Sequence, residues 1–109
     1  ISFTAANLLI SIEGQRALDI IRQFLTDEDQ QLRLQAAIVL CANAEGGVAL
    51  DTLHELFHEV PRELQVEILQ AIGSVGEKRS IPFLMTLLEE PYASIRMLAA
   101  AAMIRCAYH

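Results

Sequence analysis

The fold of this chain is decided by a ten-residue stretch, LRLQAAIVLC at residues 32–41, because its pattern occurs four times. The other copies align with it without gaps and are ISFTAANLLI at 1–10, LQVEILQAIG at 64–73 and IRMLAAAAMI at 95–104. Their first residues lie 31, 32 and 31 positions apart. A constant period of this length is the mark of a repeat protein, in which each unit is one supersecondary motif.

Three further segments, at residues 17–25, 49–57 and 80–88, alternate with these copies. Each carries apolar residues at positions i, i+3 and i+6 or i+7, which is the stripe of an amphipathic helix. Glycines at 14, 46–47 and 76 separate the repeats, and prolines at 61, 82 and 91 fall where helices should begin. The sequence therefore predicts an all-α fold of about seven helices, at 1–12, 15–26, 30–43, 47–59, 62–75, 79–89 and 92–107.

These helices can bury their apolar stripes only against the neighbouring pair, so we expect antiparallel pairs stacked into a right-handed α-solenoid, an α/α superhelix. The whole chain, 1–109, forms one domain in this interpretation. It divides into an unpaired second helix at 1–13 and three repeats at 14–45, 46–76 and 77–109. The unpaired helix is expected to expose apolar surface, and self-association through the ends of the stack is expected to follow. Because the chain opens within a helical pattern, we expect it to be a segment of a longer array.

The turn within each pair has its own pattern, in which an acidic residue is followed, after four residues, by an aliphatic residue and then an arginine. The first and third repeats read Asp27…Leu32-Arg33 and Glu90…Ile95-Arg96, and the second reads Glu59…Leu64-Gln65. This order resembles the HEAT repeat, in particular the short variety called PBS-lyase-like, and is armadillo-like in architecture. The resemblance implies structural roles linking neighbouring repeats for Asp27, Arg33, Glu59, Glu90 and Arg96. Gln65 departs from the pattern, so the link is expected to be weaker at the middle repeat.

The composition narrows the classes of partner. Eight basic and fourteen acidic residues give a net charge of −6, which repels phosphate backbones and argues against nucleic acid as a partner. No apolar run approaches the roughly 20 residues that cross a bilayer, so no membrane association is expected. Cys41 and Cys106 lie two helix layers apart, roughly 20 Å, beyond disulfide reach. Buried free thiols suit a reducing compartment, and we expect a cytoplasmic protein.

One motif carries metal chemistry, since residues 54–58 spell HExxH. On a helix this spacing puts two imidazoles on one face, with a glutamate beside them as a general base. However, the residue after the second histidine is the charged Glu59, and the only other histidine, His109, ends the chain. The sequence therefore favours a solvated helix face and no bound cofactor or catalytic metal. It leaves open an adventitious metal site at His54 and His58 and, remotely, a metal-dependent hydrolase using His54, Glu55 and His58.

With no other catalytic set in the sequence, the favoured function is a non-catalytic scaffold for protein–protein interactions. The alternative is an accessory subunit of an enzyme, such as the bilin lyases that share this repeat variety. In HEAT-type stacks the second helix of each pair lines the concave face, and its outward positions form columns. The candidate partner-binding residues in these columns are Gln35, Ile38, Glu63, Glu67, Gln70 and Leu98. Because this strip is acidic, a partner with a basic surface is expected.

Overall fold

The computed structural model describes residues 3–43 and 46–108, and these ranges contain six α-helices, five short 3-10 turns and no β-strand. The predicted all-α class is therefore confirmed. The helices are α1 (Phe3–Gln23), α2 (Gln30–Ala42), α3 (Leu50–Leu56), α4 (Arg62–Val75), α5 (Ile81–Thr86) and α6 (Ala93–Tyr108). The predicted positions at 1–2, 44–45 and 109 lie outside the described residues.

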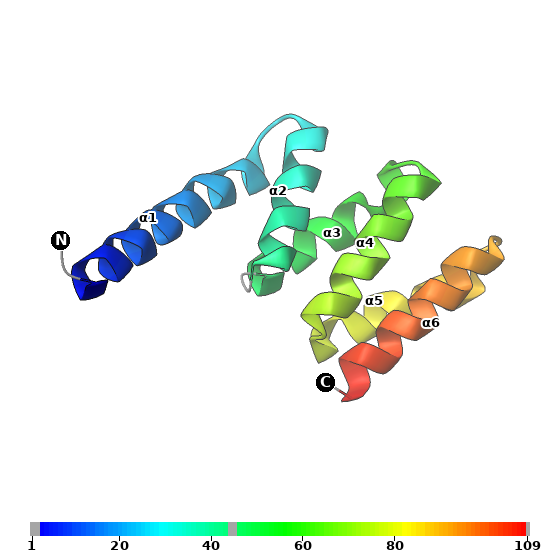
Figure 1. Ribbon diagram of the computed structural model, residues 1–109. Helices are drawn as coiled ribbons and strands as arrows, with labels where there is room; N and C mark the ends of the chain where they lie inside the picture. The colour runs from blue at the N-terminus through cyan, green and yellow to red at the C-terminus, as the bar shows by residue number, and fades with distance from the viewer. Residues whose placement is uncertain (1–2, 44–45, 109) are drawn as a thin grey trace.

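Three of the helices form a row in chain order. Helix α2 packs against α4 and α4 packs against α6, while the shorter helices lie behind them, with α3 against α2 and α5 against α6 (Figure 1). Helix α1 contacts α2 near their shared turn, and its N-terminal half projects away from the row (Figure 1). The molecule measures 57 × 34 × 20 Å and its radius of gyration is 16.0 Å. A compact chain of this length has a radius of about 13 Å, so the molecule is elongated.

The core is made by the columns that the repeat predicts. Leu53 and Leu84 share one column and are both 0% exposed, and Leu56 and Leu87 share the next and are 1% and 0% exposed. Phe24 occupies the corresponding place in the first repeat but remains 39% exposed. The same apolar pattern is therefore buried in the second and third pairs and left partly open at the α1 end.

The predicted break between helices at 1–12 and 15–26 is wrong, because α1 runs without interruption from Phe3 to Gln23 and continues as a 3-10 turn through Thr26. A side chain at Gly14 would meet no atom within 4 Å, so no neighbour forces the chain to turn there. A glycine inside a helix costs only about 1 kcal/mol relative to alanine, which is too little to end the helix by itself. One long helix replaces the two that were predicted.

The equivalent glycine one repeat later behaves differently. Gly46 begins a 3-10 turn at Gly46–Val48, and a Cβ placed on it would lie 2.3 Å from a methyl carbon of Val75. Here the close approach of α4 leaves no room for a side chain, so the site requires a glycine. Gly76 ends α4 with a left-handed φ of 70°, a conformation that favours glycine at a helix C-terminus. A glycine of this chain therefore lies at a helix boundary where a close contact or a left-handed backbone conformation requires it.

Candidate protein-binding face

The outward side of α2, α4 and α6 forms one face, which carries most of the residues predicted to bind a partner. Glu67 and Gln70 on α4 are exposed, while Ile38 on α2 and Leu98 on α6 are half-buried. The spacing of three residues between Glu67 and Gln70 puts both on one side of the helix. Polar groups and apolar side chains are thereby brought together from three helices that are far apart in sequence.

Two neighbouring grooves run along this face. The groove between α2 and α4 has a volume of about 280 Å³ and is lined by Ile38, Cys41, Ala42, Glu67, Gln70, Ala71 and Ser74. The groove between α4 and α6 has a volume of about 170 Å³ and is lined by Leu69, Gln70, Gly73, Leu98, Ala101, Ala102 and Arg105. Gln70 borders both. A partner lying across α4 would therefore meet a carboxylate in the first groove and apolar walls in both.

Small residues set the depth of the second groove. A Cβ on Gly73 would lie 3.6 Å from the Cα of Ala102 and 3.2 Å from the Cδ of Arg105, so the helices are already in close contact at this point. Larger side chains at these positions would fill the groove. Gly73 and Ala102 were not among the candidate residues predicted from the sequence. Arg105 falls in the same repeat column as Ala42 and Ser74, which line the first groove.

Two predicted binding residues lie apart from these grooves. Gln35 lines a third groove, between α1 and α2. Glu63 is exposed in the first turn of α4. Beside it, the guanidinium of Arg62 lies 3.5 Å from the ring centroid of Tyr92, in a cation–π contact that joins the start of α4 to the segment before α6.

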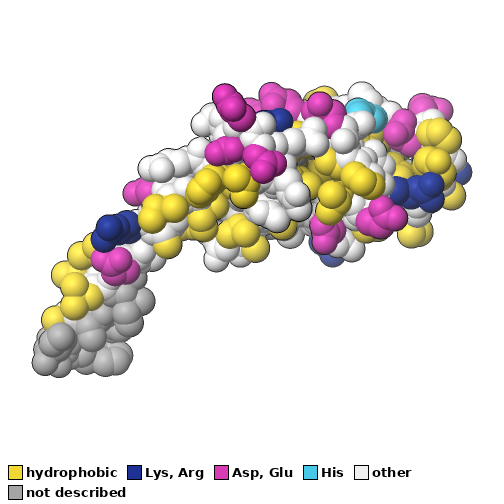
Figure 2. All heavy atoms as spheres, turned by 90° about the horizontal axis from the view of Figure 1, so that it is seen from above, with side chains coloured by type: hydrophobic (Ala, Val, Ile, Leu, Met, Phe, Trp, Pro, Cys, Tyr) yellow, Lys and Arg dark blue, Asp and Glu magenta, His cyan; other side chains and the backbone are white. Residues whose placement is uncertain are grey.

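Charge is distributed unevenly over the surface. Figure 2 shows acidic side chains interspersed with hydrophobic ones along the body of the molecule. Two carboxylates of α4, Glu63 and Glu67, lie one helical turn apart on its exposed side. The basic side chain of Arg105 lines the far groove. The face is therefore acidic on the side that borders α2 and basic at one point beside α6.

The turn residues fasten each pair internally. Arg33 Nη1 donates to the carbonyls of Asp27 (2.7 Å) and Glu28 (3.2 Å). Arg96 Nη1 donates in the same way to the carbonyls of Glu90 (2.8 Å) and Pro91 (2.9 Å). Both arginines thus bind the turn of their own pair, so these bonds hold the turn rather than joining one repeat to the next.

The middle repeat differs in both the donor and the acceptor. Gln65 Nε2 makes one bond, to the carbonyl of Phe57 at 2.9 Å, which lies two positions before Glu59, the residue aligned with Asp27 and Glu90. Among the turn acids, Asp27 Oδ1 accepts from the backbone N–H of Asp29 at 2.8 Å. Glu59 is exposed in the 3-10 turn Phe57–Glu59. A contact between repeats comes instead from Glu90, whose Oε1 lies 3.9 Å from Nδ1 of His58.

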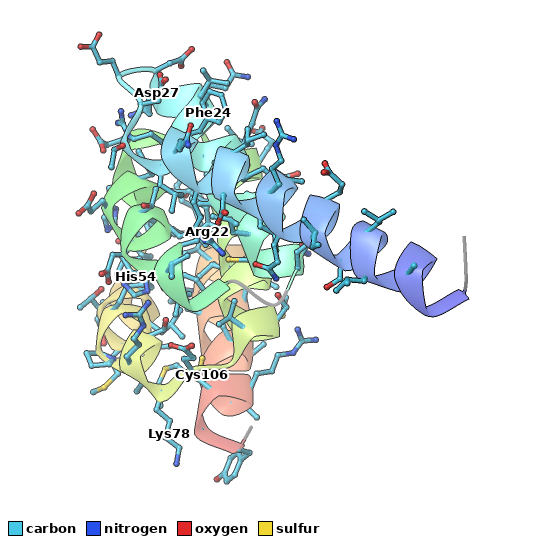
Figure 3. All side chains as sticks on the ribbon, turned by 90° about the vertical axis from the view of Figure 1, so that its left-hand side faces the viewer. Arg22, Phe24, Asp27, His54, Lys78 and Cys106 are labelled. Atoms are coloured by element: carbon cyan, nitrogen blue, oxygen red, sulfur yellow. The ribbon has the colours of Figure 1, made fainter. Side chains whose placement is uncertain are left out.

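The two histidines of the HExxH sequence face different neighbours. His54 Nε2 lies 3.1 Å from Oγ of the buried Ser80, and its ring stacks on Phe83 with centroids 4.5 Å apart. Figure 3 shows His54 where α3 meets α5. Burial lowers the pKa of His54 below its usual value of 6.5, and Arg79 lowers it further while Asp51 opposes the shift. Through its contacts with Ser80 and Phe83, His54 joins the second repeat to the third.

His58 is more exposed, and its Nδ1 faces the carboxylate of Glu90. Within residues 3–43 and 46–108, no group of three or more His, Cys, Asp or Glu side chains is placed to hold a metal ion. The two cysteines are free and buried, and burial raises the pKa of the Cys41 thiol to about 11. Burial also raises the pKa of Cys106, with Glu77 adding to the shift.

In comparisons with known proteins, no protein-family model matches the chain, and a search of curated proteins finds no match. Among the helices in residues 3–43 and 46–108, none combines the length and the apolar character that spanning a bilayer requires.

Proposed function

We propose that this chain is a non-catalytic protein-binding scaffold, a HEAT-like α-solenoid segment that binds a basic partner across α4. The solenoid part of the proposal is supported by the row of α2, α4 and α6, which repeats with the period of 31 or 32 residues read from the sequence. It is also supported by Arg33 and Arg96, which lie 63 positions apart and make equivalent pairs of hydrogen bonds. Right-handed stacking of further repeats on this segment would extend the same face.

The observation that carries the binding proposal is the pair of adjacent grooves that share Gln70. Rigid helices on both sides of each groove keep its walls in place, which lowers the ordering cost of binding. Ile38 and Leu98, one in each groove, offer apolar anchors on either side of the polar ridge of α4. An extended or helical segment laid across the ridge would contact all three helices.

The expected partner is basic because of the charge on and around α4. Glu63 and Glu67 present two exposed carboxylates, and the net charge of −6 adds to their field at a distance. Arg62 contacts the Tyr92 ring, which orients its charge toward the α6 side rather than toward the α2–α4 groove. Each exposed ion pair would contribute only about 0.2–1 kcal/mol, so electrostatics would speed the encounter and the apolar anchors would supply affinity.

The non-catalytic part of the proposal is supported by the contacts of the HExxH residues. His54 is engaged with Ser80 and Phe83, so its ring is held against the next repeat. A metal-dependent hydrolase would need both imidazoles to turn toward one ion together with a third ligand. The contacts give each histidine a different neighbour.

The binding proposal can be tested with Lys/Arg-rich peptides labelled for fluorescence anisotropy, titrated at low and at physiological salt. We expect the Glu63→Lys/Glu67→Lys variant to bind about 2- to 30-fold more weakly than the wild type, the range that two lost surface ion pairs predict. The matched control is Glu55→Lys/Glu89→Lys, which makes the same change in net charge at exposed sites on α3 and at the end of the third-repeat turn. Equal weakening by both variants would show that net charge, and not this face, governs binding.

A further inference from the structure

The row of helices stops at α2, where an apolar groove remains open. This groove, about 170 Å³ in volume, is lined by Ile21, Phe24, Leu32, Gln35, Ala36 and Val39. At Ile21 it continues into a wider opening between α1 and the end of α2, bordered by Ser11, Leu18 and Asn43 among others. Phe24 is 39% exposed and Val39 is 40% exposed, so apolar surface on both walls is in contact with water.

The repeat identifies what kind of element fits there. In α4 the side that corresponds to this groove is covered by α2, and in α6 it is covered by α4. The residue of α6 in the same column as Val39 is Ala102, which is only 3% exposed. The open side of α2 is therefore the place of a further helix in the same row, and a helix bound there would continue the α2–α4 and α4–α6 interfaces.

The chain contains one more copy of the row-helix sequence, in the N-terminal part of α1, residues 3–13, which we call the arm. Leu9 of the arm is in the same column as Leu40 and Ile72, which are both 0% exposed, yet Leu9 is 53% exposed. Leu8 and Ile12 are also exposed, at 61% and 52%. Figure 2 shows hydrophobic side chains on this projecting end of the molecule.

In this conformation the arm cannot fill the groove of its own chain. Because α1 is one continuous helix, the arm points away from α2 and lies beyond the end of that helix (Figure 1). An arm of 11 residues is about 16 Å long, and the 13-residue α2 is about 20 Å long, so the arm has the length to cover α2. The arm of another molecule can approach the groove without bending.

We propose that the arm of a second copy occupies the α1–α2 groove, and that two molecules exchange their arms in a two-fold dimer. Exchange of identical elements is a direct route to a closed homodimer, since each copy contributes one arm and one groove. In the arm only the last residue, Glu13, is charged, and it is exposed at the end nearest the rest of α1. None of the six residues that line the groove is charged, so the apolar part of the arm, residues 3–12, docks without burying a charge. This surface lies on the opposite side of α2 from the groove that it forms with α4, so the dimer does not depend on the binding function proposed above.

The test is the oligomeric state by sedimentation and light scattering over a wide range of concentration. We expect the wild type to dimerise and both Leu9→Asp, in the arm, and Val39→Asp, in the groove, to weaken dimerisation about 100-fold or more. The control Ile104→Asp changes a residue that is 60% exposed on α6, at the other end of the row, and should dimerise like the wild type. Circular dichroism checks that each variant is folded, and Phe24→Lys replaces Val39→Asp if the latter is not.

Mixing the two variants identifies the contact. A heterodimer of Leu9→Asp with Val39→Asp retains one wild-type arm in one wild-type groove, so the mixture should form dimers that neither variant forms alone. A wild type that stays monomeric at every concentration would overturn the proposal. Loss of the dimer in Ile104→Asp would also overturn it. The same holds if the dimer is lost in Leu9→Asp but kept in both Val39→Asp and Phe24→Lys, because the association would then use a different surface.

Discussion

The clearest perturbation is Gly46→Ala, because the same column holds Gly14 one repeat earlier and the two sites have opposite surroundings. At Gly46 the new methyl group would lie 2.3 Å from Cγ2 of Val75 and 3.2 Å from the Cα of Cys41. Valine is stiff about χ1, and the Cys41 atom belongs to the backbone, so neither neighbour moves aside easily. The segment around Gly46 must shift instead.

The expected size of the effect follows from overpacking. Inserting one methyl group into a well-packed site costs about 1–3 kcal/mol. For a domain of this size each kcal/mol lowers the melting temperature by roughly 4–8 °C. At Gly14 nothing lies within 4 Å, and alanine is favoured over glycine in a helix by about 1 kcal/mol. Gly14→Ala should therefore strengthen the helical signal of α1 and leave the melting temperature unchanged or higher.

Thermal and urea unfolding followed by circular dichroism would measure both variants, and Val75→Ala provides the internal control. Because Val75→Ala removes the methyl group that clashes, the Gly46→Ala/Val75→Ala double variant should be more stable than the sum of the single effects predicts, by about 0.5–3 kcal/mol. Strict additivity, or a Gly46→Ala protein as stable as the wild type, would refute the argument that the approach of α4 requires glycine here.

Two further predictions concern titratable groups. Burial lowers the pKa of His54 in the folded protein below 6.5. As the pH falls, His54 is therefore protonated in the unfolded chain before it is protonated in the folded protein. The contribution of this residue to stability should thus decrease as the pH falls through about 6.5. The free energy of unfolding of the wild type relative to His54→Gln should thus decrease between pH 8 and pH 5, and a difference independent of pH would contradict it. A Cys41 pKa of about 11 leaves roughly 100-fold less thiolate than the ordinary value of 9.0, so a disulfide reagent should modify this thiol far more slowly in the folded protein than in urea. A Cys41→Ser variant separates its signal from that of Cys106, and rapid labelling of Cys41 in the folded protein would be the contrary result.

The turn residues show how much of the structure a sequence pattern can predict. The acidic residue and the arginine after it indicated structural roles, and Arg33 and Arg96 do hold their turns through backbone carbonyls. The pattern did not show that these bonds stay within one pair, nor that Gln65 makes a bond to Phe57. A residue type fixes which groups can donate, but the path of the chain fixes which acceptor is within reach.

The candidate site was predictable to the same extent. The column rule placed Ile38, Glu67, Gln70 and Leu98 on one side of the row helices, and the structure brings these four to two adjacent grooves. Gln35 obeys the same rule and still lies in another groove, because the helix that α2 meets on that side is α1 and not another row helix. The column that a residue belongs to predicts the side of the helix on which it lies. The element that packs on that side determines what the residue contacts.

The sequence by itself determined the helical class, the repeat period and the buried columns such as Leu53 with Leu84, because the 3.6-residue periodicity of apolar side chains is a local property. Only the tertiary structure decided that α1 continues through Gly14 while the chain turns at Gly46, and that His54 binds Ser80 instead of facing His58 across an ion. The local sequence is compatible with both outcomes at each of these positions. The free-energy difference between them comes from atoms that lie more than twenty residues away in the chain, such as the methyl group of Val75 and the hydroxyl of Ser80.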